Sequence, residues 1–361
     1  MRRIIDLRSD TVTHPTPAMR EAMYRAEVGD DVMGEDPTVN RLQEMAAERM
    51  GKEAALFVAS GTMGNLVCIL AHCGRGDEAI MGDKAHSFLL EAGGPSVLGG
   101  VHVRTVRNRE DGTLDAAEVE DAVRADNVHF PRSRLVVLEN THNRCGGAVL
   151  SRAQMDPIVA VARKHNFNAH LDGARIFNAA VALGAEAKTL AEPFDTVSFC
   201  LSKGLSAPVG SLACGTKEFV YEARRLRKVL GGGMRQAGVI AAAGIVALEQ
   251  MVERLADDHA NARRLAEGLA GMGVFDIKLE RVQSNILIFR LATDRFTPAQ
   301  LMARCAQDGL KFQAIEGAQF RMVTHYGVQR EDVDAALGIV RRAVGELAGG
   351  WPRSEPLTLG Q

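Results

Sequence analysis

The sequence has little of what marks a secreted, disulfide-stabilised protein. It contains one tryptophan, and aromatic residues make up only 5% of the chain. No two cysteines form a C-x-x-C pair, and several lie in apolar runs, so we expect buried thiols in a reducing compartment rather than a disulfide framework. The six cysteines are Cys68, Cys73, Cys145, Cys200, Cys214 and Cys305.

Neither sign of charge dominates, and no apolar run is long. The 43 Lys+Arg and 45 Asp+Glu residues give a net charge of −2, which excludes a broadly basic nucleic-acid binder and a strongly acidic disordered chain. The longest apolar run, VIAAAGIVAL, is shorter than the ~20 residues that a bilayer-spanning helix needs. The opening residues, MRRIIDLRSDTVTHP, carry charges too early for a signal-peptide core. We therefore expect a cytoplasmic protein that binds neither nucleic acid nor membrane.

Glycine is abundant, with 36 residues in 361, and short apolar runs alternate with amphipathic helical patterns. This alternation predicts an α/β fold with a mostly parallel sheet flanked by helices. Helical patterns cover residues 114–125 and 156–166. The predicted strands cover residues 54–60, 77–81, 101–106, 134–140, 167–172, 195–202 and 210–215.

The pattern changes near residue 250. A long helical pattern over residues 239–270 is followed by a mixture of short strands and helices. We predict a large domain over residues 1–250 that begins with an N-terminal arm (1–20), and a smaller α+β domain over 251–346. The remaining residues, 347–361, are rich in Gly, Pro and Ser and predict a flexible tail.

The segment ASGTMGNLVCIL (59–70) joins a predicted strand to an apolar helix. Its turn places the backbone N–H groups of Gly61 and Thr62, with the hydroxyls of Ser60 and Thr62, at a helix N-terminus. Such a terminus binds anions, although Ser60 alone has a simpler explanation as a helix cap. The segment contains neither G-x-x-x-x-G-K-[ST] nor G-x-G-x-x-G, so a nucleoside triphosphate or a dinucleotide is not favoured.

Asp172 and Lys203 follow two further predicted strands, in HLDGARIF (170–177) and FCLSKG (199–204). Taken singly, an aspartate in this place caps the next helix, and a lysine near a strand end usually reaches solvent. A functional interpretation makes Asp172 a buried carboxylate for a cationic partner and turns Arg175 toward an anion. In the same interpretation, Lys203 forms a Schiff base.

The combination favours the functional interpretation. Ser60, Asn140, Asp172 and Lys203 all end strands of one predicted parallel sheet, at the edge where open α/β folds bind ligands. Pyridoxal 5'-phosphate needs an anchored phosphate, a carboxylate beside its ring nitrogen and a lysine for its aldehyde. We therefore predict this cofactor. We expect no metal, because the sequence contains neither H-E-x-x-H nor a Cys/His cluster.

Six motifs resemble one family, the low-specificity L-threonine aldolases, and the match as a whole runs from residue 6 to about 346. These are fold-type-I pyridoxal-phosphate enzymes of the aromatic-amino-acid β-eliminating lyase group. The motifs are DLRSDTVTHPTPAM (6–19), GEDPTVNRLQ (34–43), ASGTMGN (59–65), HLDGARIFNA (170–179), LSKGLSAPVGS (201–211) and GGGMRQ (231–236).

The resemblance implies a role for individual residues toward the cofactor. Lys203 matches the lysine that bonds to the cofactor aldehyde, and Asp172 matches the carboxylate paired with the ring nitrogen. His86 resembles the histidine that stacks on the ring. The residues that the resemblance and the motifs assign to cofactor binding are Ser60, Gly61, Thr62, His86, Asp172, Arg175, Lys203 and Arg235.

The resemblance also implies a substrate site. Ser9, Arg175 and Arg321 resemble the group that holds the substrate carboxylate, and His129 resembles a second histidine that reaches the substrate hydroxyl. The proton acceptor for that hydroxyl is His86, His129 or a water between them. Arg235 is expected to approach the phosphate from a neighbouring subunit, because the family builds its sites at a dimer interface and pairs dimers into homotetramers.

The activity that the resemblance implies is cleavage of the Cα–Cβ bond of L-threonine or L-allo-threonine to glycine and an aldehyde. One departure concerns Met33, where the family commonly has tyrosine; a methionine supplies only adaptable apolar surface. This leaves a phenylserine aldolase or a β-eliminating lyase on the same scaffold as alternatives. A cofactor-binding protein with a regulatory role is disfavoured by the presence of Lys203, Asp172 and His86 together.

Overall fold

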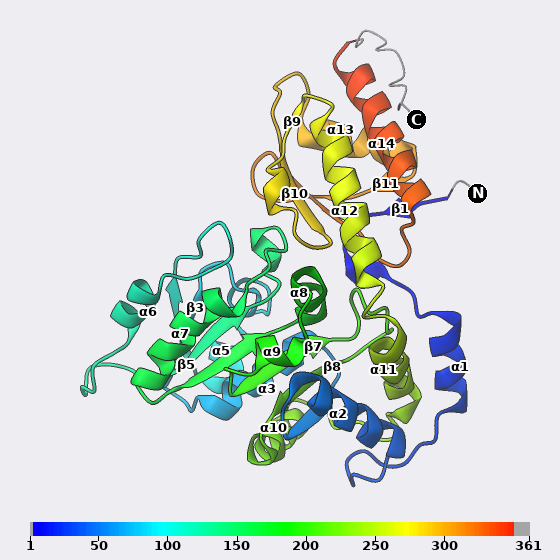
Figure 1. Cartoon of the computed structure of the whole chain (residues 1–361). Helices are drawn as coiled ribbons and strands as arrows, with labels where there is room; N and C mark the ends of the chain where they lie inside the picture. The colour runs from blue at the N-terminus through cyan, green and yellow to red at the C-terminus, as the bar shows by residue number, and fades with distance from the viewer. Residues whose placement is uncertain (1–2, 350–361) are drawn as a thin grey trace.

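The computed structural model describes residues 3–349, which form a large lower unit and a smaller upper one (Figure 1). The lower unit is built on a seven-stranded sheet in the order β2-β8-β7-β6-β5-β3-β4. Strand β8 is antiparallel to both of its neighbours, and the other pairs are parallel. The strands are β2 (Ala54–Val58), β3 (Glu78–Gly82), β4 (His102–Val106), β5 (Ser133–Glu139), β6 (Asn168–Asp172), β7 (Thr196–Cys200) and β8 (Ser211–Gly215). The predicted α/β class and all seven predicted strands are confirmed.

Helices cover both faces of this sheet. They do so because successive residues of a strand point to opposite sides, and these strands have apolar residues on both sides. In β5, Val136 and Leu138 join one core, while Leu135 and Val137 join the other. The first face is covered by α2 (Pro37–Met50), α6 (Ala116–Ala122), α7 (Arg152–Lys164), α8 (Ile176–Leu183), α9 (Ala187–Ala191) and α11 (Gly238–Gln250). The second face is covered by α3 (Gly61–His72), α5 (Gly94–Gly99) and α10 (Lys217–Val229). The short α4 (His86–Leu89) follows β3, and α1 (Pro17–Arg25) packs on α11.

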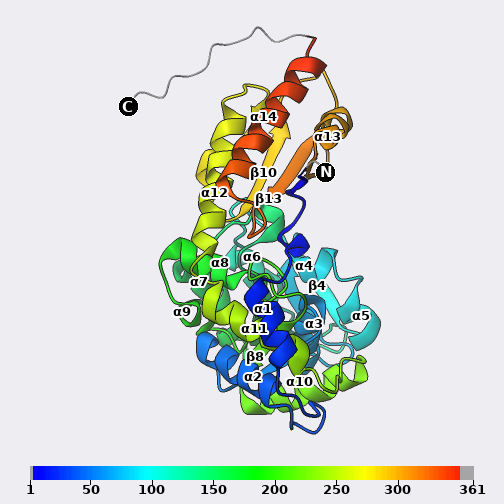
Figure 2. The ribbon, with the colours of Figure 1, turned by 90° about the vertical axis from the view of Figure 1, so that its right-hand side faces the viewer.

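The upper unit has its own sheet and its own core. Its antiparallel sheet has the order β12-β13-β10-β9, and β1 pairs with β11 in a separate two-stranded sheet. The strands are β1 (Ile5–Asp6), β9 (Phe275–Asp276), β10 (Ile286–Leu291), β11 (Leu310–Lys311), β12 (Gln313–Ala314) and β13 (Gln319–Val323). The helices are α12 (Leu255–Ala270), α13 (Pro298–Gln307) and α14 (Arg330–Leu347), of which α12 rises out of the lower unit (Figure 2).

The N-terminal arm joins the two units. Ile5 and Leu7 lie in the core of the upper unit, whereas Met19 of α1 lies in the core of the lower one. The division at about residue 250 stays a prediction. The helical pattern at 239–270 forms two helices, α11 and α12, separated by turn residues 251–254. From residue 350 onward, the predicted tail lies outside the described residues. Within residues 3–349, no helix has the length and apolar character needed to cross a membrane.

Candidate active site

Lys203 lies directly after β7, on the edge of the sheet where β5, β6 and β7 also end. Its backbone carbonyl accepts a 3.1 Å hydrogen bond from the Thr13 hydroxyl, which ties this segment to the N-terminal arm. Its side chain is half-buried, and no hydrogen bond or ion pair involves its ammonium group within residues 3–349. The predicted role of Lys203 requires such an amine, and that role stays a prediction.

Asp172, the last residue of β6, is a buried carboxylate in the same region. Its Oδ2 accepts a hydrogen bond of 2.8 Å from Asn65 Nδ2, and its Oδ1 accepts one of 3.1 Å from the backbone N–H of Ala174. Asn65 reaches Asp172 from α3, on the second face of the sheet. Asp172 is thus held rigidly, with its carboxylate available to a cationic partner.

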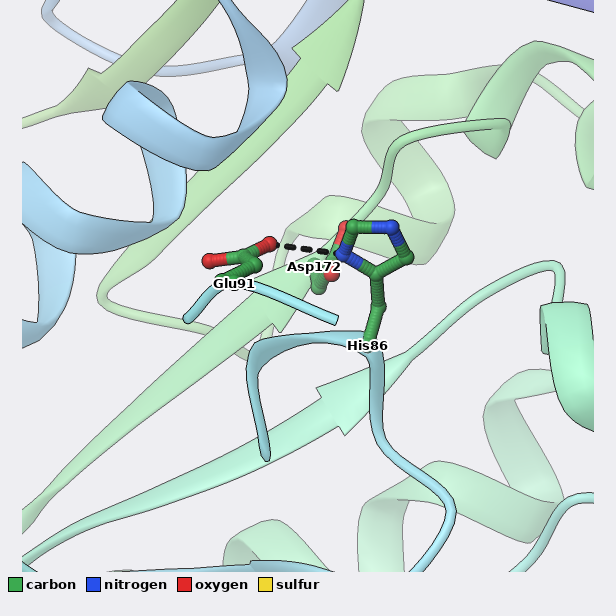
Figure 3. Close-up of side chains that lie close together, drawn as sticks. All are labelled: His86, Glu91 and Asp172. Atoms are coloured by element: carbon green, nitrogen blue, oxygen red, sulfur yellow. Dashed lines mark hydrogen bonds and ion pairs between the residues drawn. The ribbon is translucent and has the colours of Figure 1, made fainter. Parts of the chain in front are cut away.

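His86 lies beside Asp172, at the start of α4. Figure 3 shows its ring facing the carboxylate of Glu91, and its Nδ1 lies 2.7 Å from Glu91 Oε1. Burial lowers the pKa of His86, but the hydrogen bond with Glu91 and the charges of Asp172 and Glu91 outweigh burial and raise it above its usual value. The charge of Lys203 acts in the opposite direction. His86 lies beside Asp172, and Lys203 follows the neighbouring strand β7 at the same end of the sheet.

The predicted anion-binding turn lies at the N-terminus of α3. Ser60 caps the helix, since its Oγ accepts a hydrogen bond of 3.2 Å from the backbone N–H of Met63. The N–H groups of Gly61 and Thr62 belong to the first turn and have no acceptor within the helix. A Cβ at Gly61 would lie 2.7 Å from Cys200 Sγ, so only glycine fits there. Ser60 acts as the helix cap, and anion binding at this turn stays a prediction.

Arg175 is buried and already has a carboxylate partner. Its Nε and Nη2 each lie 2.7 Å from an oxygen of Asp10. Burial raises the pKa of Asp10, but Arg175, Lys203 and Arg321 outweigh it and hold that pKa far below its usual value. The two N–H groups of Nη1 and the second N–H of Nη2 remain for a substrate carboxylate. The neighbouring Ser9 is half-buried, and its Oγ accepts hydrogen bonds from the backbone and hydroxyl of Thr11.

Arg321 reaches the same region from β13 of the upper unit. It is 8% exposed, and it donates to the Arg8 carbonyl at 3.1 Å and to Asn143 Oδ1 at 2.9 Å. Its Nε is buried without a partner within the described residues. Burial and the charge of Arg175 lower its pKa to about 10. Arg321 and Arg175 are therefore two neighbouring positive charges, and the negative charge of Asp10 neutralises them only in part.

Two predicted site residues lie elsewhere within a single chain. His129 is exposed and comes four residues before β5 begins, whereas the site lies where β5 ends. Arg235 pairs with Asp30 at 2.8 Å, and its side chain is 57% exposed. Within one chain, the length of β5 separates His129 from His86. The roles of His129 and Arg235 stay predictions, with Arg235 expected to approach the phosphate from a neighbouring subunit.

The structure adds residues that the sequence did not single out. Glu91 and Asn65 connect His86 to Asp172, and Asp10 neutralises Arg175. Glu139, at the end of β5, accepts hydrogen bonds of 2.9 Å from the backbone N–H groups of His86 and Asn143. Asp10 directly follows Ser9, and Glu91 lies in the segment that contains His86. The only sequence signal for Asp10 and Glu91 was therefore that each is a charged residue close to a predicted site residue.

His86, Glu91 and Asp172 offer ligand atoms that all lie within 4.8 Å of one another. These atoms already exchange hydrogen bonds with each other or with Asn65. The three side chains are therefore already hydrogen-bonded within the protein. The absence of a metal stays a prediction.

Comparisons with known proteins point in one direction. A family model described as beta-eliminating lyase matches residues 6–292. The chain is 45% identical over 346 residues to low-specificity L-threonine aldolase 1 of Arabidopsis thaliana, covering 95% of this chain and 97% of that protein. It is 46% identical over 330 residues to the low specificity L-threonine aldolase of Escherichia coli strain K12, covering 91% and 96%. The fold is similar to that of the threonine aldolase of Leishmania major, with a TM-score of 0.79, 19% identity and coverage of 93% and 98%.

Proposed function

The chain belongs to the low-specificity L-threonine aldolases of the β-eliminating lyase family, and we propose that it cleaves the Cα–Cβ bond of L-threonine and L-allo-threonine, giving glycine and acetaldehyde. One observation carries the proposal. A free lysine, a buried carboxylate and a histidine, namely Lys203, Asp172 and His86, converge from three different segments at one edge of the sheet. This combination is what pyridoxal phosphate chemistry requires.

The donor set of the site fits pyridoxal 5'-phosphate. Within residues 3–349 the Lys203 amine has no hydrogen-bond or ion-pair partner and would bind the aldehyde. Asp172 has a buried carboxylate for the protonated ring nitrogen, and the first turn of α3 offers its N–H groups to the phosphate. His86 lies beside Asp172, and its ring would contact the bound cofactor. When bound, the cofactor supplies an electron-accepting ring for the carbon–carbon bond that breaks.

The residues of this chain bind and orient the amino acid. Arg321 holds the substrate carboxylate, with Ser9 and the free Nη1 of Arg175 beside it, because a guanidinium group is the natural partner of a carboxylate. A carboxylate fixed in this way sets which bond of Cα faces the cofactor ring. A base must also accept the proton of the β-hydroxyl, and His86, which lies at this edge in the same chain, is our candidate.

The decisive experiment supplies the purified protein with pyridoxal phosphate and measures glycine and aldehyde released from L-threonine and L-allo-threonine. Lys203→Ala is expected to abolish product formation, whereas Lys188→Ala, at an exposed lysine paired with Glu186, is expected to retain it. Borohydride reduction followed by peptide mapping should mark the peptide that contains Lys203. Full activity of the Lys203→Ala protein would sink the proposal.

A second candidate substrate class follows from Met33. This residue is 69% exposed and borders a surface hollow of about 590 Å³ together with Tyr221 and Val229. If this surface contributes to the site of a neighbouring chain, a methionine there gives adaptable apolar contact for bulkier side chains. L-phenylserine therefore belongs in the substrate panel, and a β-eliminating activity would appear as release of an α-keto acid instead of glycine.

We also propose that the working protein is a homotetramer, a dimer of dimers with sites at the dimer interface. The residues flanking three site elements are apolar and exposed, as expected of surfaces that a second copy covers. Val128 is 97% and Phe130 45% exposed on either side of His129, and Met33 is exposed near Arg235. Phe88, Leu89 and Leu90, directly after His86, are 40–47% exposed. In such a dimer, His129 and Arg235 of one chain would reach the site of the other chain.

The proposed location is the cytoplasm. All six cysteines are free thiols within the described residues, and five of them are buried. This is the pattern of a protein that folds in a reducing compartment.

A further inference from the structure

Glu91 is a buried carboxylate at the site, and the reaction proposed above assigns it no role. Its side chain is 2% exposed, and its Oε1 lies 2.7 Å from His86 Nδ1 and 2.8 Å from Asn65 Nδ2. In Figure 3 the second nitrogen of the His86 ring points away from Glu91. Glu91 therefore contacts one ring nitrogen of His86 and leaves the other free.

Asn65 fixes the direction of these hydrogen bonds. Its Nδ2 carries two hydrogens, and it lies 2.8 Å from Glu91 Oε1 and 2.8 Å from Asp172 Oδ2. Its Oδ1 accepts a hydrogen bond of 2.7 Å from Ser198 Oγ, which confirms that the nitrogen faces the carboxylates. Since imidazole is a stronger base than a carboxylate, the proton between Glu91 and His86 resides on Nδ1. The neutral ring then has a lone pair at Nε2.

A second carboxylate fixes the backbone of the same residue. Glu139 Oε2 accepts a hydrogen bond of 2.9 Å from the backbone N–H of His86, at the start of a helix that has no side-chain cap of its own. The backbone and the ring of His86 are thus both held by buried carboxylates. Rotation of the ring would break the bond to Glu91 and leave a buried acceptor without its donor.

We propose that Glu91 is a positioning residue: it holds His86 with its proton on Nδ1, so that Nε2 accepts the proton of the substrate β-hydroxyl. This inference rests on the proposed function and selects His86 from the three bases that the sequence left open. His129 lies at the opposite edge of the sheet within the same chain, so it has no comparable support. The charged groups that face His86 are Glu91, Asp172 and Lys203, with Glu139 at its backbone.

The test compares Glu91→Gln with a matched control, Glu78→Gln. Glu78 is another buried carboxylate on a histidine, 2.9 Å from His102 Nδ1, but it lies at the start of β3, away from the site. Glutamine keeps an oxygen that can accept from Asn65 and His86, and it removes the charge that stabilises protonated His86. Hydrogen–deuterium exchange at the C2 position of each histidine, followed by mass spectrometry, gives the pKa of His86 in each holoenzyme.

The expected result is a fall of at least about one unit in the pKa of His86 in Glu91→Gln, a tenfold change in its protonation equilibrium. The acidic limb of kcat/KM for L-threonine moves to lower pH by the same amount, because His86 must be neutral at Nε2 to accept a proton. Glu78→Gln leaves both quantities at the wild-type values. Glu91→Asp keeps the charge but shortens the side chain, so kcat falls at every pH while KM changes little.

Two results would overturn the inference. One is a His86 pKa that Glu91→Gln leaves unchanged. The other is an acidic limb that stays in place although the His86 pKa has moved, since His86 would then be held by Glu91 without accepting the proton. Failure of the proposed function itself looks different, because the wild-type protein would then release no glycine from L-threonine while the exchange measurement still reported the Glu91–His86 pair.

Discussion

The guanidinium group of Arg175 binds the carboxylate of Asp10 through two hydrogen bonds of 2.7 Å, and both side chains are almost completely buried. Asp10 comes from the N-terminal arm and Arg175 from the turn after β6, so the pair fastens the arm over the edge of the sheet. Resemblance alone assigns Arg175 to the substrate carboxylate. The structure shows that two of its five N–H groups hold the protein's own chain in place.

Removal of Arg175 is therefore expected to cost stability more than binding. Arg175→Met removes the ion-pair partner of the buried Asp10, and breaking a buried pair in this way typically lowers the free energy of unfolding by about 3–5 kcal/mol. In the exposed pair of Arg163 and Asp195, the matched change Arg163→Met should cost about 1 kcal/mol or less. Urea unfolding measures both. The double variant Asp10→Asn, Arg175→Met should recover part of the loss, and equal losses for the buried and exposed pairs would contradict this prediction.

Much of the fold could be predicted because each strand carries its own signal. The run RLVVLEN encodes β5 through apolar residues that serve both faces, and the same holds for the other strands of the large sheet. Asp172 and Lys203 were found for a related reason: each follows such a run, and the ends of parallel strands meet at one edge. The antiparallel direction of β8 was not predicted, since apolar character does not encode strand direction.

The partners of the site residues could not be predicted, because they depend on contacts between distant segments. Asn65 and Asp172 are 107 residues apart, and Asp10 and Arg175 are 165 apart. No local pattern distinguishes Glu91 from an ordinary exposed glutamate until α3, α4 and β6 pack together. His129 illustrates the reverse case, since its resemblance to a catalytic histidine gives no indication of which chain it serves.

Arg321 is expected to act on substrate affinity. Arg321→Lys keeps the charge but cannot donate to the Arg8 carbonyl and Asn143 while also binding a carboxylate. A charged hydrogen bond is worth about 1.5–3 kcal/mol, so KM for L-threonine should rise roughly 10- to 100-fold while kcat falls much less. Arg290→Lys, at an exposed arginine of the adjacent strand β10, is the control. Steady-state kinetics decide, and an unchanged KM would remove Arg321 from the carboxylate site.

Ser206 has a backbone that suits glycine better. Its φ is +63°, its side chain is buried, and its hydroxyl has no partner within the described residues. Ser206→Gly relieves a left-handed conformation and removes an unsatisfied hydroxyl, at some cost in unfolded-state entropy. We expect a net gain of about 1 kcal/mol in the free energy of unfolding. Asn166→Gly, at φ +56° in a residue type that tolerates this conformation, should gain less. Denaturant unfolding of the two variants side by side checks the order.

One buried histidine, His170, and two half-buried ones, His72 and His259, are expected to make the protein sensitive to mild acid. Burial lowers the pKa of His72, His170 and His259 to about 4 in each case. Between pH 6.5 and 4 the unfolded chain binds protons that the folded chain does not, so stability should fall as pH decreases through this range. His259→Gln should flatten the slope by removing one of these groups. Unfolding free energies measured at several pH values test this, and an equal slope in the variant would contradict it.

The shared site makes the sharpest prediction about assembly. If Lys203 and Arg235 of one site come from two different chains, neither Lys203→Ala nor Arg235→Ala alone should be active. Mixing the two variants under conditions that let subunits exchange creates dimers in which one site has both wild-type residues. Random pairing restores about a quarter of the wild-type sites, because half of the dimers are mixed and each has one complete site. If both residues act within one chain, every mixed site stays defective and no activity returns. The activity of the mixture, read beside its mass by light scattering, therefore tells whether Arg235 leaves its contact with Asp30 to serve a neighbour or remains where its own chain places it.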